Sequence, residues 1–288
     1  MKRADAMQTR IEAINALKGG DEIKAKLNEL HHFLKDKEPY VLLNSLADFL
    51  LVGKPGCGMK TVVSTVSEYL YVAKAIDFCG KEKWFSFELN YTTPESHFYE
   101  IDKFKQKMYV IKGFNRYFKG SIYINLDKWI GHTEEDYFKL FLNFLSSIDD
   151  RILFFFGIHT EKQEEIDEIY AKLYQYIRID LIKLRFPDTK ELSELVVSFI
   201  QNKGFTFSEN TLAIIQNMIE IVVSQSQFKG FRTIEKFSDA IIYHFFMNNN
   251  NQTKEITVDI LDSYQKNSFY VKPSSGDVET KQTIGFIR

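Results

Sequence analysis

Hydrophobic and polar residues follow two different patterns along this chain, and the pattern changes near residue 187. In the first part, four short, almost continuously apolar runs alternate with segments in which apolar residues recur at helical spacing. Continuously apolar runs of this length are typical of strands that are buried on both faces of a parallel sheet. The predicted strands are residues 49–52, 84–89, 121–126 and 152–157.

The segments around these strands predict helices. Residues 7–35 predict two helices joined by a turn at Gly19-Gly20, and residues 59–74 predict a helix directly after the first strand. Two more helices are expected at 134–147 and 162–176. Strands that alternate with helices in this order predict an α/β domain with right-handed crossovers between parallel strands.

Beyond residue 187 the strand-like runs stop. Segments 189–203, 208–224 and 231–247 have the amphipathic pattern of helices, so a small all-α domain is expected there. The predicted domain plan is a helix pair at 1–40, an α/β domain at 41–187, the helical domain at 188–270 and an extended tail at 271–288.

Composition narrows the classes of partner. The 288 residues include 37 Lys and Arg against 39 Asp and Glu, which leaves a formal charge of -2 and no overall basic field for nucleic acid or an anionic membrane. The two cysteines, Cys57 and Cys79, fit a reducing compartment better than a disulfide framework. No apolar run approaches the ~20 residues needed to cross a bilayer. We therefore expect a cytoplasmic protein without nucleic-acid or membrane partners.

A glycine-rich loop follows the first predicted strand. Gly53-Lys54-Pro55-Gly56-Cys57-Gly58 lies between the apolar residues 49–52 and a helix that starts near Met59. This is the layout of a P-loop, in which backbone N–H groups and a helix N-terminus receive the phosphates of a nucleotide. The candidate nucleotide-binding residues here are Gly53, Pro55, Gly56, Cys57, Gly58, Met59, Lys60 and Thr61.

The order of these parts resembles the AAA+ ATPases, and more closely their CbbX/SpoVK-like branch. The matching segments are 17–24, 53–58, 157–160, 186–192 and 228–232. The resemblance implies a P-loop α/β domain followed by a small helical lid, with ATP or ADP as the bound nucleotide. It also implies Thr160 or His159 as a first sensor of the nucleotide and Arg232 as a second.

The P-loop departs from the family pattern, which places Lys and then Ser or Thr directly after the last glycine. Aligned without a gap, Met59 takes the lysine position and Lys60 the hydroxyl position, which is the register that the following helix favours. A one-residue bulge would instead place Lys60 and Thr61 there. In the gapless register no positive side chain stands at the position that binds the β- and γ-phosphates. A lysine near the metal position would also repel Mg²⁺.

The end of the third strand departs as well. The family places Asp-Glu there, for Mg²⁺ and for the attacking water. The gapless register puts Asn125 and Leu126 at these positions, and a shift of two residues puts Asp127 and Lys128 there. Neither register supplies a glutamate. Arg178 is the nearest match to the family's arginine finger, and it is one residue out of step.

These departures predict a pseudo-ATPase that binds ATP or ADP weakly, with Mg²⁺ doubtful, and that hydrolyses poorly or not at all. It would serve as a regulatory or structural subunit or as a scaffold, partnered by a protein such as an active AAA+ paralogue or by its own copies. The alternative is an active, chaperone-like AAA+ ATPase that remodels a protein partner. It would use Lys60, Asp127 and Arg178 in catalysis, with Thr61 and Asp127 as Mg²⁺ ligands.

Overall fold

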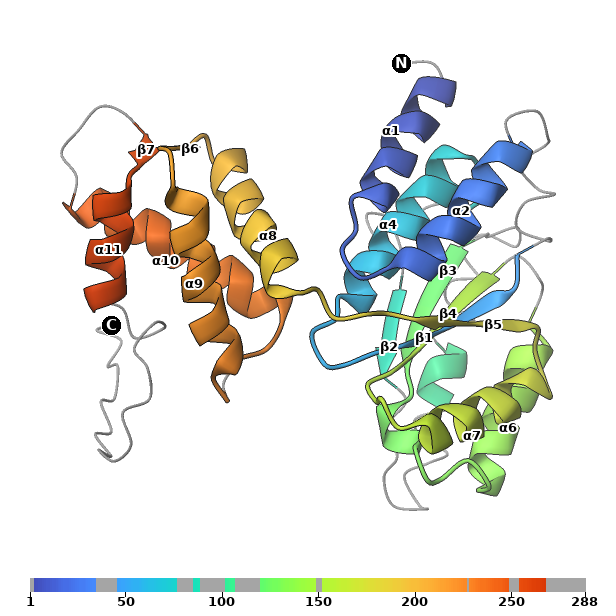
Figure 1. Cartoon of the computed structure of the whole chain (residues 1–288). Coiled ribbons are helices and arrows are strands. Elements are labelled where there is room, and N and C mark those ends of the chain that lie inside the picture. The colour runs from blue at the N-terminus through green and yellow to red at the C-terminus, as the bar shows by residue number, and fades with distance from the viewer. Residues whose placement is uncertain are drawn as a thin grey trace. The chain divides into compact units, whose positions relative to one another are not determined.

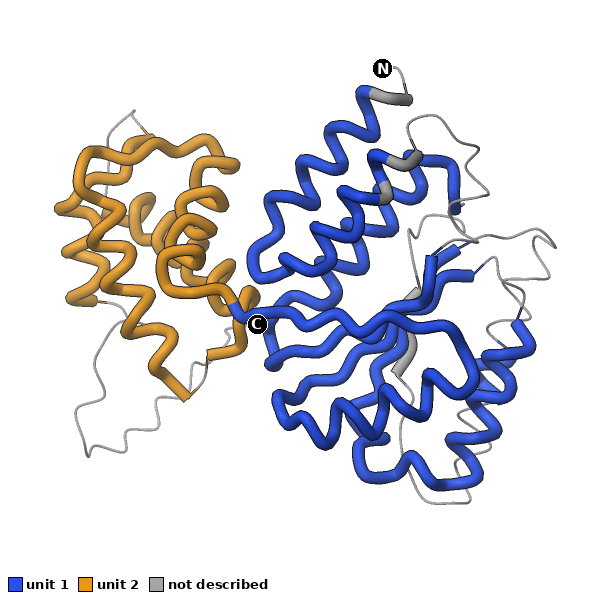
Figure 2. The backbone as a smooth tube through the Cα atoms, turned by 45° about the vertical axis from the view of Figure 1, so that its right-hand side comes forward, with its two compact units in different colours: residues 1–186 blue, residues 187–288 orange. Residues whose placement is uncertain are grey.

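The computed structural model describes two compact units, residues 1–186 and residues 187–288 (Figure 2). The described residues are 3–34, 46–76, 85–88, 102–106, 120–148, 152–226, 228–248 and 254–267. The predicted tail at 271–288 and Cys79 lie outside them. Among the described residues, none of the helices has the length and apolar character that crossing a membrane requires.

The first unit is built on a five-stranded sheet in the order β2-β3-β4-β1-β5, and every neighbouring pair of strands is parallel. Its strands are β1 (Asp48–Val52), β2 (Phe85–Glu88), β3 (Gly120–Asn125), β4 (Ile152–Ile158) and β5 (Ile179–Lys183). The four predicted strands are confirmed. The fifth, β5, was not among them, because this edge strand carries charged residues and lacks a continuous apolar run.

Side chains that alternate along the strands build one core on each face of the sheet. Phe49, Leu51 and Phe155 pack on one face with α1 (Arg3–Asn15), α2 (Asp21–Leu34) and α4 (Met59–Val72). Leu50 and Phe156 pack on the other face with α6 (Asp136–Ser146) and α7 (Gln163–Tyr174). Figure 1 shows these two helical layers on opposite sides of the strands. Burial on both faces explains why the central strands are apolar throughout.

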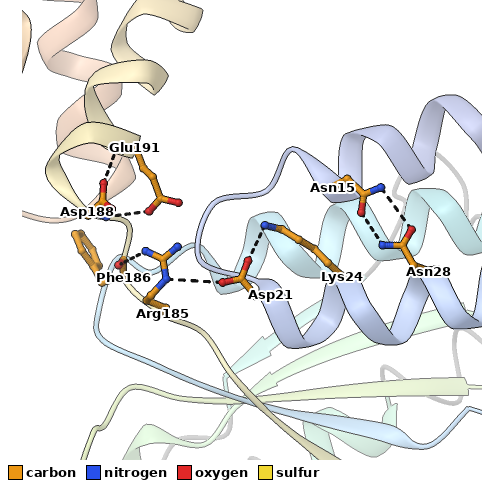
Figure 3. A network of polar contacts seen from close by, with 8 residues as sticks. All are labelled: Asn15, Asp21, Lys24, Asn28, Arg185, Phe186, Asp188 and Glu191. Atoms are coloured by element: carbon orange, nitrogen blue, oxygen red, sulfur yellow. Dashed lines mark hydrogen bonds and ion pairs between the residues drawn. The ribbon is translucent and has the colours of Figure 1, made fainter.

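The turn between α1 and α2 is fixed to the segment that follows β5. Gly19 has a φ of +75°, and a Cβ there would lie 1.9 Å from the carbonyl oxygen of Arg185. The Arg185 N–H donates to the carbonyl of Gly19 at 2.8 Å, and its guanidinium lies 3.8 Å from Asp21 (Figure 3). Only glycine allows this close approach, which accounts for the Gly19-Gly20 break in the helical pattern.

The second unit is mainly helical. It contains α8 (Thr189–Asn202), α9 (Thr211–Ser224), α10 (Phe231–Asn248) and α11 (Val258–Asn267), so its three predicted helices are confirmed and one is added. A short parallel pair, β6 (Thr206–Phe207) with β7 (Glu255–Ile256), is also added. A capping box starts α8: Asp188 accepts from the Glu191 N–H at 2.8 Å, and Glu191 accepts from the Asp188 N–H at 3.0 Å.

Candidate nucleotide site at the ends of the central strands

The loop between β1 and α4 has the backbone shape of a phosphate-binding loop. Gly56 and Gly58 have φ values of +87° and +90°, a left-handed conformation that glycine adopts without strain. The Cys57 N–H donates to the Lys54 carbonyl at 3.0 Å and closes a tight turn. A Cβ on Gly53 would lie 2.7 Å from the Leu184 carbonyl oxygen and 2.8 Å from the Cys57 sulfur. Gly56 and Gly58 therefore allow the left-handed backbone of this loop, and Gly53 allows its close contact with Leu184 and Cys57.

The N-terminus of α4 supplies donors to this loop. Gly58 is the N-cap residue and has no side chain to cap the helix. The first intrahelical bond of α4 is the one from the Val62 N–H to the Gly58 carbonyl, at 3.0 Å. The N–H groups of the first turn, residues 59–61, therefore have no acceptor within the helix, and the helix dipole favours an anion in front of them. These glycines and N–H groups are the backbone features of a phosphate-binding loop.

Cys57 fills space beneath the loop. Its side chain is buried, and burial raises the pKa of the thiol to about 11. The thiol is therefore protonated at neutral pH and acts as a small apolar side chain.

Met59, at the position of the family's lysine in the gapless register, is part of the core. Its side chain is only 3% exposed, and the Tyr123 hydroxyl donates to its sulfur at 3.8 Å. Tyr123 lies in turn over Gly157 of β4, where a Cβ would come within 2.3 Å of the tyrosine oxygen. Residues of α4, β3 and β4 thus hold Met59 in place. Lys60 and Thr61, the next two residues, are exposed.

Alternation along β3 places Asn125 on the side of the sheet that faces α4. Ser121 lies on that side, 2.6 Å from the hydroxyl of Ser67 in α4, and Tyr123 lies there as well. Successive side chains of a strand point to opposite faces, so Asn125 shares the face of Ser121 and Tyr123. Asp127 lies beyond the strand, at the first position of the short 3₁₀ helix η1 (Asp127–Trp129).

Asp127 is the centre of a polar cluster at the ends of β3 and β4. One carboxylate oxygen accepts the backbone N–H of His159 at 2.6 Å. The other lies 2.7 Å from Nδ1 of the same histidine and accepts from the Asn125 amide at 3.0 Å. Burial favours a higher pKa for Asp127, but the hydrogen bonds from His159 and Asn125 together outweigh it and lower the pKa. The carboxylate is therefore ionised and hydrogen-bonded within the protein.

The donor set at these strand ends does not fit a magnesium ion. Mg²⁺ requires oxygen ligands in near-octahedral geometry. Both oxygens of Asp127 already accept hydrogen bonds, and the exposed Lys60 lies directly beside Thr61 in the sequence.

Thr160 also lies at the end of β4, but its hydroxyl is engaged locally. It donates to Glu165 and accepts the Lys162 N–H at 3.1 Å, where α7 begins. Next to it in the chain, Glu161 lies 3.1 Å from the Lys54 amine and forms an exposed ion pair with the glycine-rich loop. The residues predicted from the loop, Asn125, Asp127 and Thr160 thus gather at the carboxyl ends of neighbouring strands.

Of the two predicted arginines, Arg178 is not part of this cluster. Arg178 directly precedes β5, and its carbonyl accepts the N–H of Asp48 at the start of β1 at 2.9 Å. It therefore lies at the amino ends of the parallel strands, at the edge opposite to the glycine-rich loop. Arg232 is an exposed residue in the first turn of α10, in the second unit.

Sequence reasoning missed two features of the site. Tyr123 was counted only as part of a strand, although alternation along that strand already places it on the α4 side. The pairing of Asp127 with His159 joins residues 32 positions apart and depends on β3 and β4 being neighbours.

Solved structures share this fold. The Thermotoga maritima RuvB Holliday junction branch migration motor matches with a TM-score of 0.52 and 14% identity, over 86% of this chain and 69% of that chain. A mutant of the same motor gives a TM-score of 0.53 at 15% identity, over 86% and 70%. C. elegans PCH-2 gives 0.51 at 12% identity, over 85% and 66%. No protein-family model and no curated protein matches the sequence. These likenesses, all at 15% identity or below, show that the chain shares the fold of these proteins, in which a parallel sheet is flanked by helices.

Proposed function

We propose that this protein is an AAA+-like pseudo-ATPase of the CbbX/SpoVK type. It binds ATP or ADP weakly, through the backbone of the loop between β1 and α4, and hydrolyses ATP poorly or not at all. Its biological role is that of a regulatory or structural subunit, or of a scaffold for another protein.

The burial of Met59 carries this proposal. A P-loop lysine holds the β- and γ-phosphates with its charge. Met59 has no charge, and its side chain packs into the core against Tyr123. Backbone N–H groups do not depend on side chains, so nucleotide binding by the loop survives this change while phosphoryl transfer loses its charge stabilisation.

The end of β3 supports the same conclusion. Asn125, Leu126 and Asp127 follow one another there, and Leu126 is fully buried. No glutamate stands in this segment to orient and activate an attacking water. The loss of a positioned general base lowers rates by ~10²–10⁴.

A protein partner would then give this molecule its role. An active AAA+ paralogue is one candidate, and self-association is the other. In either assembly, Arg178 would face a neighbouring subunit's nucleotide and Arg232 would sense the nucleotide bound by its own chain. These two roles follow from the family resemblance.

One observation favours the alternative, an active ATPase that uses Lys60, Thr61 and Asp127. Lys60 and Thr61 are exposed at the start of α4, and an ionised carboxylate, Asp127, lies at the end of a neighbouring strand. If both motifs adopt the shifted alignment, Lys60 would bind the phosphates, and Thr61 and Asp127 would bind Mg²⁺.

The test is steady-state ATP hydrolysis by the pure full-length protein, together with thermal stabilisation by ADP. We expect stabilisation at millimolar ADP, as mass action requires of a weak ligand, and hydrolysis well below ~1 s⁻¹, the low end of ordinary enzyme rates. Lys60→Ala should change hydrolysis no more than Lys190→Ala, a control at an exposed lysine of α8. Turnover at ~1 s⁻¹ or more that Lys60→Ala abolishes would establish the alternative.

A further inference from the structure

We propose that the Asp127 carboxylate is bound by His159 in place of Mg²⁺, so that the glycine-rich loop takes nucleotides in their magnesium-free form. The inference rests on the proposed function, because it specifies which form of the nucleotide the same site accepts.

Asp127 makes three polar contacts with groups of its own protein. Its two oxygens accept the His159 N–H at 2.6 Å and the Asn125 amide at 3.0 Å, and the His159 ring nitrogen lies 2.7 Å away. Asn125 is fixed in turn, because its amide oxygen accepts the Asp127 N–H at 2.9 Å. A metal ion would have to compete with these donors for the charge of the carboxylate. Charge-assisted hydrogen bonds of this kind are among the strong ones in proteins.

His159 cannot easily move away from Asp127. The histidine holds the carboxylate through both its backbone and its ring, so a rotation of the ring alone leaves the 2.6 Å backbone contact intact. The strand ends beneath it are joined on both sides. The Leu126 N–H donates to the Gly157 carbonyl at 2.9 Å, and the Gly53 N–H donates to the Ile158 carbonyl at 3.4 Å. Releasing Asp127 from the backbone N–H of His159 therefore requires the aspartate side chain to rotate or the ends of β3 and β4 to shift.

Two lysines can balance the charge that magnesium would otherwise neutralise. Lys54 belongs to the loop itself, and Lys60 lies in the first turn of α4. Lys54 is tied to Glu161 at 3.1 Å, and both side chains are largely exposed, so water screens this pair and an anion can compete for the amine. Mg²⁺-free ATP is more negative than Mg²⁺-ATP and suits such cations at a helix N-terminus.

The experiment compares ATP affinity in magnesium and in EDTA, by calorimetry on the full-length protein. We expect wild-type Kd values that agree within about twofold, whereas a site that ligates Mg²⁺ would lose about tenfold or more in EDTA. His159→Ala removes the ring contact to one oxygen of Asp127 and keeps the backbone bond to the other, so that one oxygen becomes more accessible to Mg²⁺. Binding should then become about tenfold tighter in magnesium than in EDTA. His159→Ala combined with Asp127→Asn should abolish that difference.

The matched control is His132→Ala, which removes a different histidine that lies 3.5 Å from a carboxylate, that of Glu135. It should leave the two affinities equal. A wild-type protein that needs magnesium for ATP binding would overturn the inference, as would a His159→Ala variant that stays indifferent to magnesium.

A second measurement does not depend on nucleotide. Proton NMR should show a downfield imidazole N–H resonance that His159→Ala and Asp127→Asn remove and that millimolar Mg²⁺ leaves unchanged. Its absence from the wild type, or a saturable shift with Mg²⁺, would contradict the pairing. If no nucleotide binds in either buffer, the proposed function fails, and this resonance alone decides whether His159 holds Asp127.

Discussion

The loop between β1 and α4 and the ends of β3 and β4 occupy the same edge of the sheet, but they differ in what they offer a nucleotide. The loop offers backbone: two glycines with positive φ and the N–H groups of a helix N-terminus, which have no acceptor within the helix. The strand ends offer side chains, and those of Asn125, Asp127 and His159 bind one another. The comparison shows that a loop can keep the backbone conformation of a phosphate-binding loop while the polar side chains at the adjacent strand ends bind one another.

Tyr123 joins the two regions, and its removal should have the largest effect. Tyr123→Ala deletes a fully buried ring that packs over Gly157 and touches Met59, so we expect a loss of about 3–5 kcal/mol of unfolding free energy. Tyr123→Phe keeps the ring and removes the weak bond from the hydroxyl to the Met59 sulfur, so it should cost about 1 kcal/mol or less. Urea denaturation measures both, and equal losses would show that the ring does not pack as described.

Gly53→Ala should distort the backbone of the loop between β1 and α4 without changing the contacts of Asp127 at the strand ends. The added Cβ meets the backbone oxygen of Leu184 at 2.7 Å, so we expect about 1–3 kcal/mol of destabilisation and the loss of ADP binding. Gly131→Ala is the control, since Gly131 has open space around its Cβ position; unlike Gly53, it has a positive φ. It should cost about 1–2 kcal/mol from backbone strain alone. Its ADP-induced thermal shift should equal that of the wild type.

Lowering the pH should remove the contribution that Asp127, at the strand ends, makes to the stability of the protein. The pKa of Asp127 is lower in the folded protein than in the unfolded chain, so the unfolded state takes up this proton first as the pH falls. Its stabilising contribution is complete above the unfolded value of ~3.9. This contribution to the free energy of unfolding is lost as the pH falls through the lower pKa of Asp127 in the folded protein. Stability curves of the wild type and Asp127→Asn, measured by denaturation at each pH, should therefore converge in acid, and parallel curves would contradict this.

The smallest effect is expected where the two regions meet at the surface. Glu161→Gln removes the partner of Lys54, a pair in which both side chains are more than half exposed. Exposed pairs contribute about 1 kcal/mol or less, so thermal unfolding should hardly change. Stabilisation of the protein by ADP should increase, because the Lys54 amine becomes available to the phosphates. Weaker stabilisation by ADP would show that Glu161 supports the loop rather than competing with its ligand.

The sequence by itself determined the strand–loop–helix unit, the positions of the first four strands along the chain and the helical nature of the second unit. These features follow from local rules, since apolar runs, helical spacing and glycines act on residues close together in the chain. The same rules could not find β5, whose charged residues Asp180 and Lys183 are tolerated only because the strand lies at the edge of the sheet.

Only the tertiary structure decided how the candidate site is occupied by its own side chains. Met59 meets Tyr123 across 64 positions of sequence, and Asp127 meets His159 across 32. Both contacts exist because β3, β4 and β1 lie next to one another and present the same face to α4. A linear sequence names the residues at each strand end, but packing decides whether their side chains face a ligand or one another.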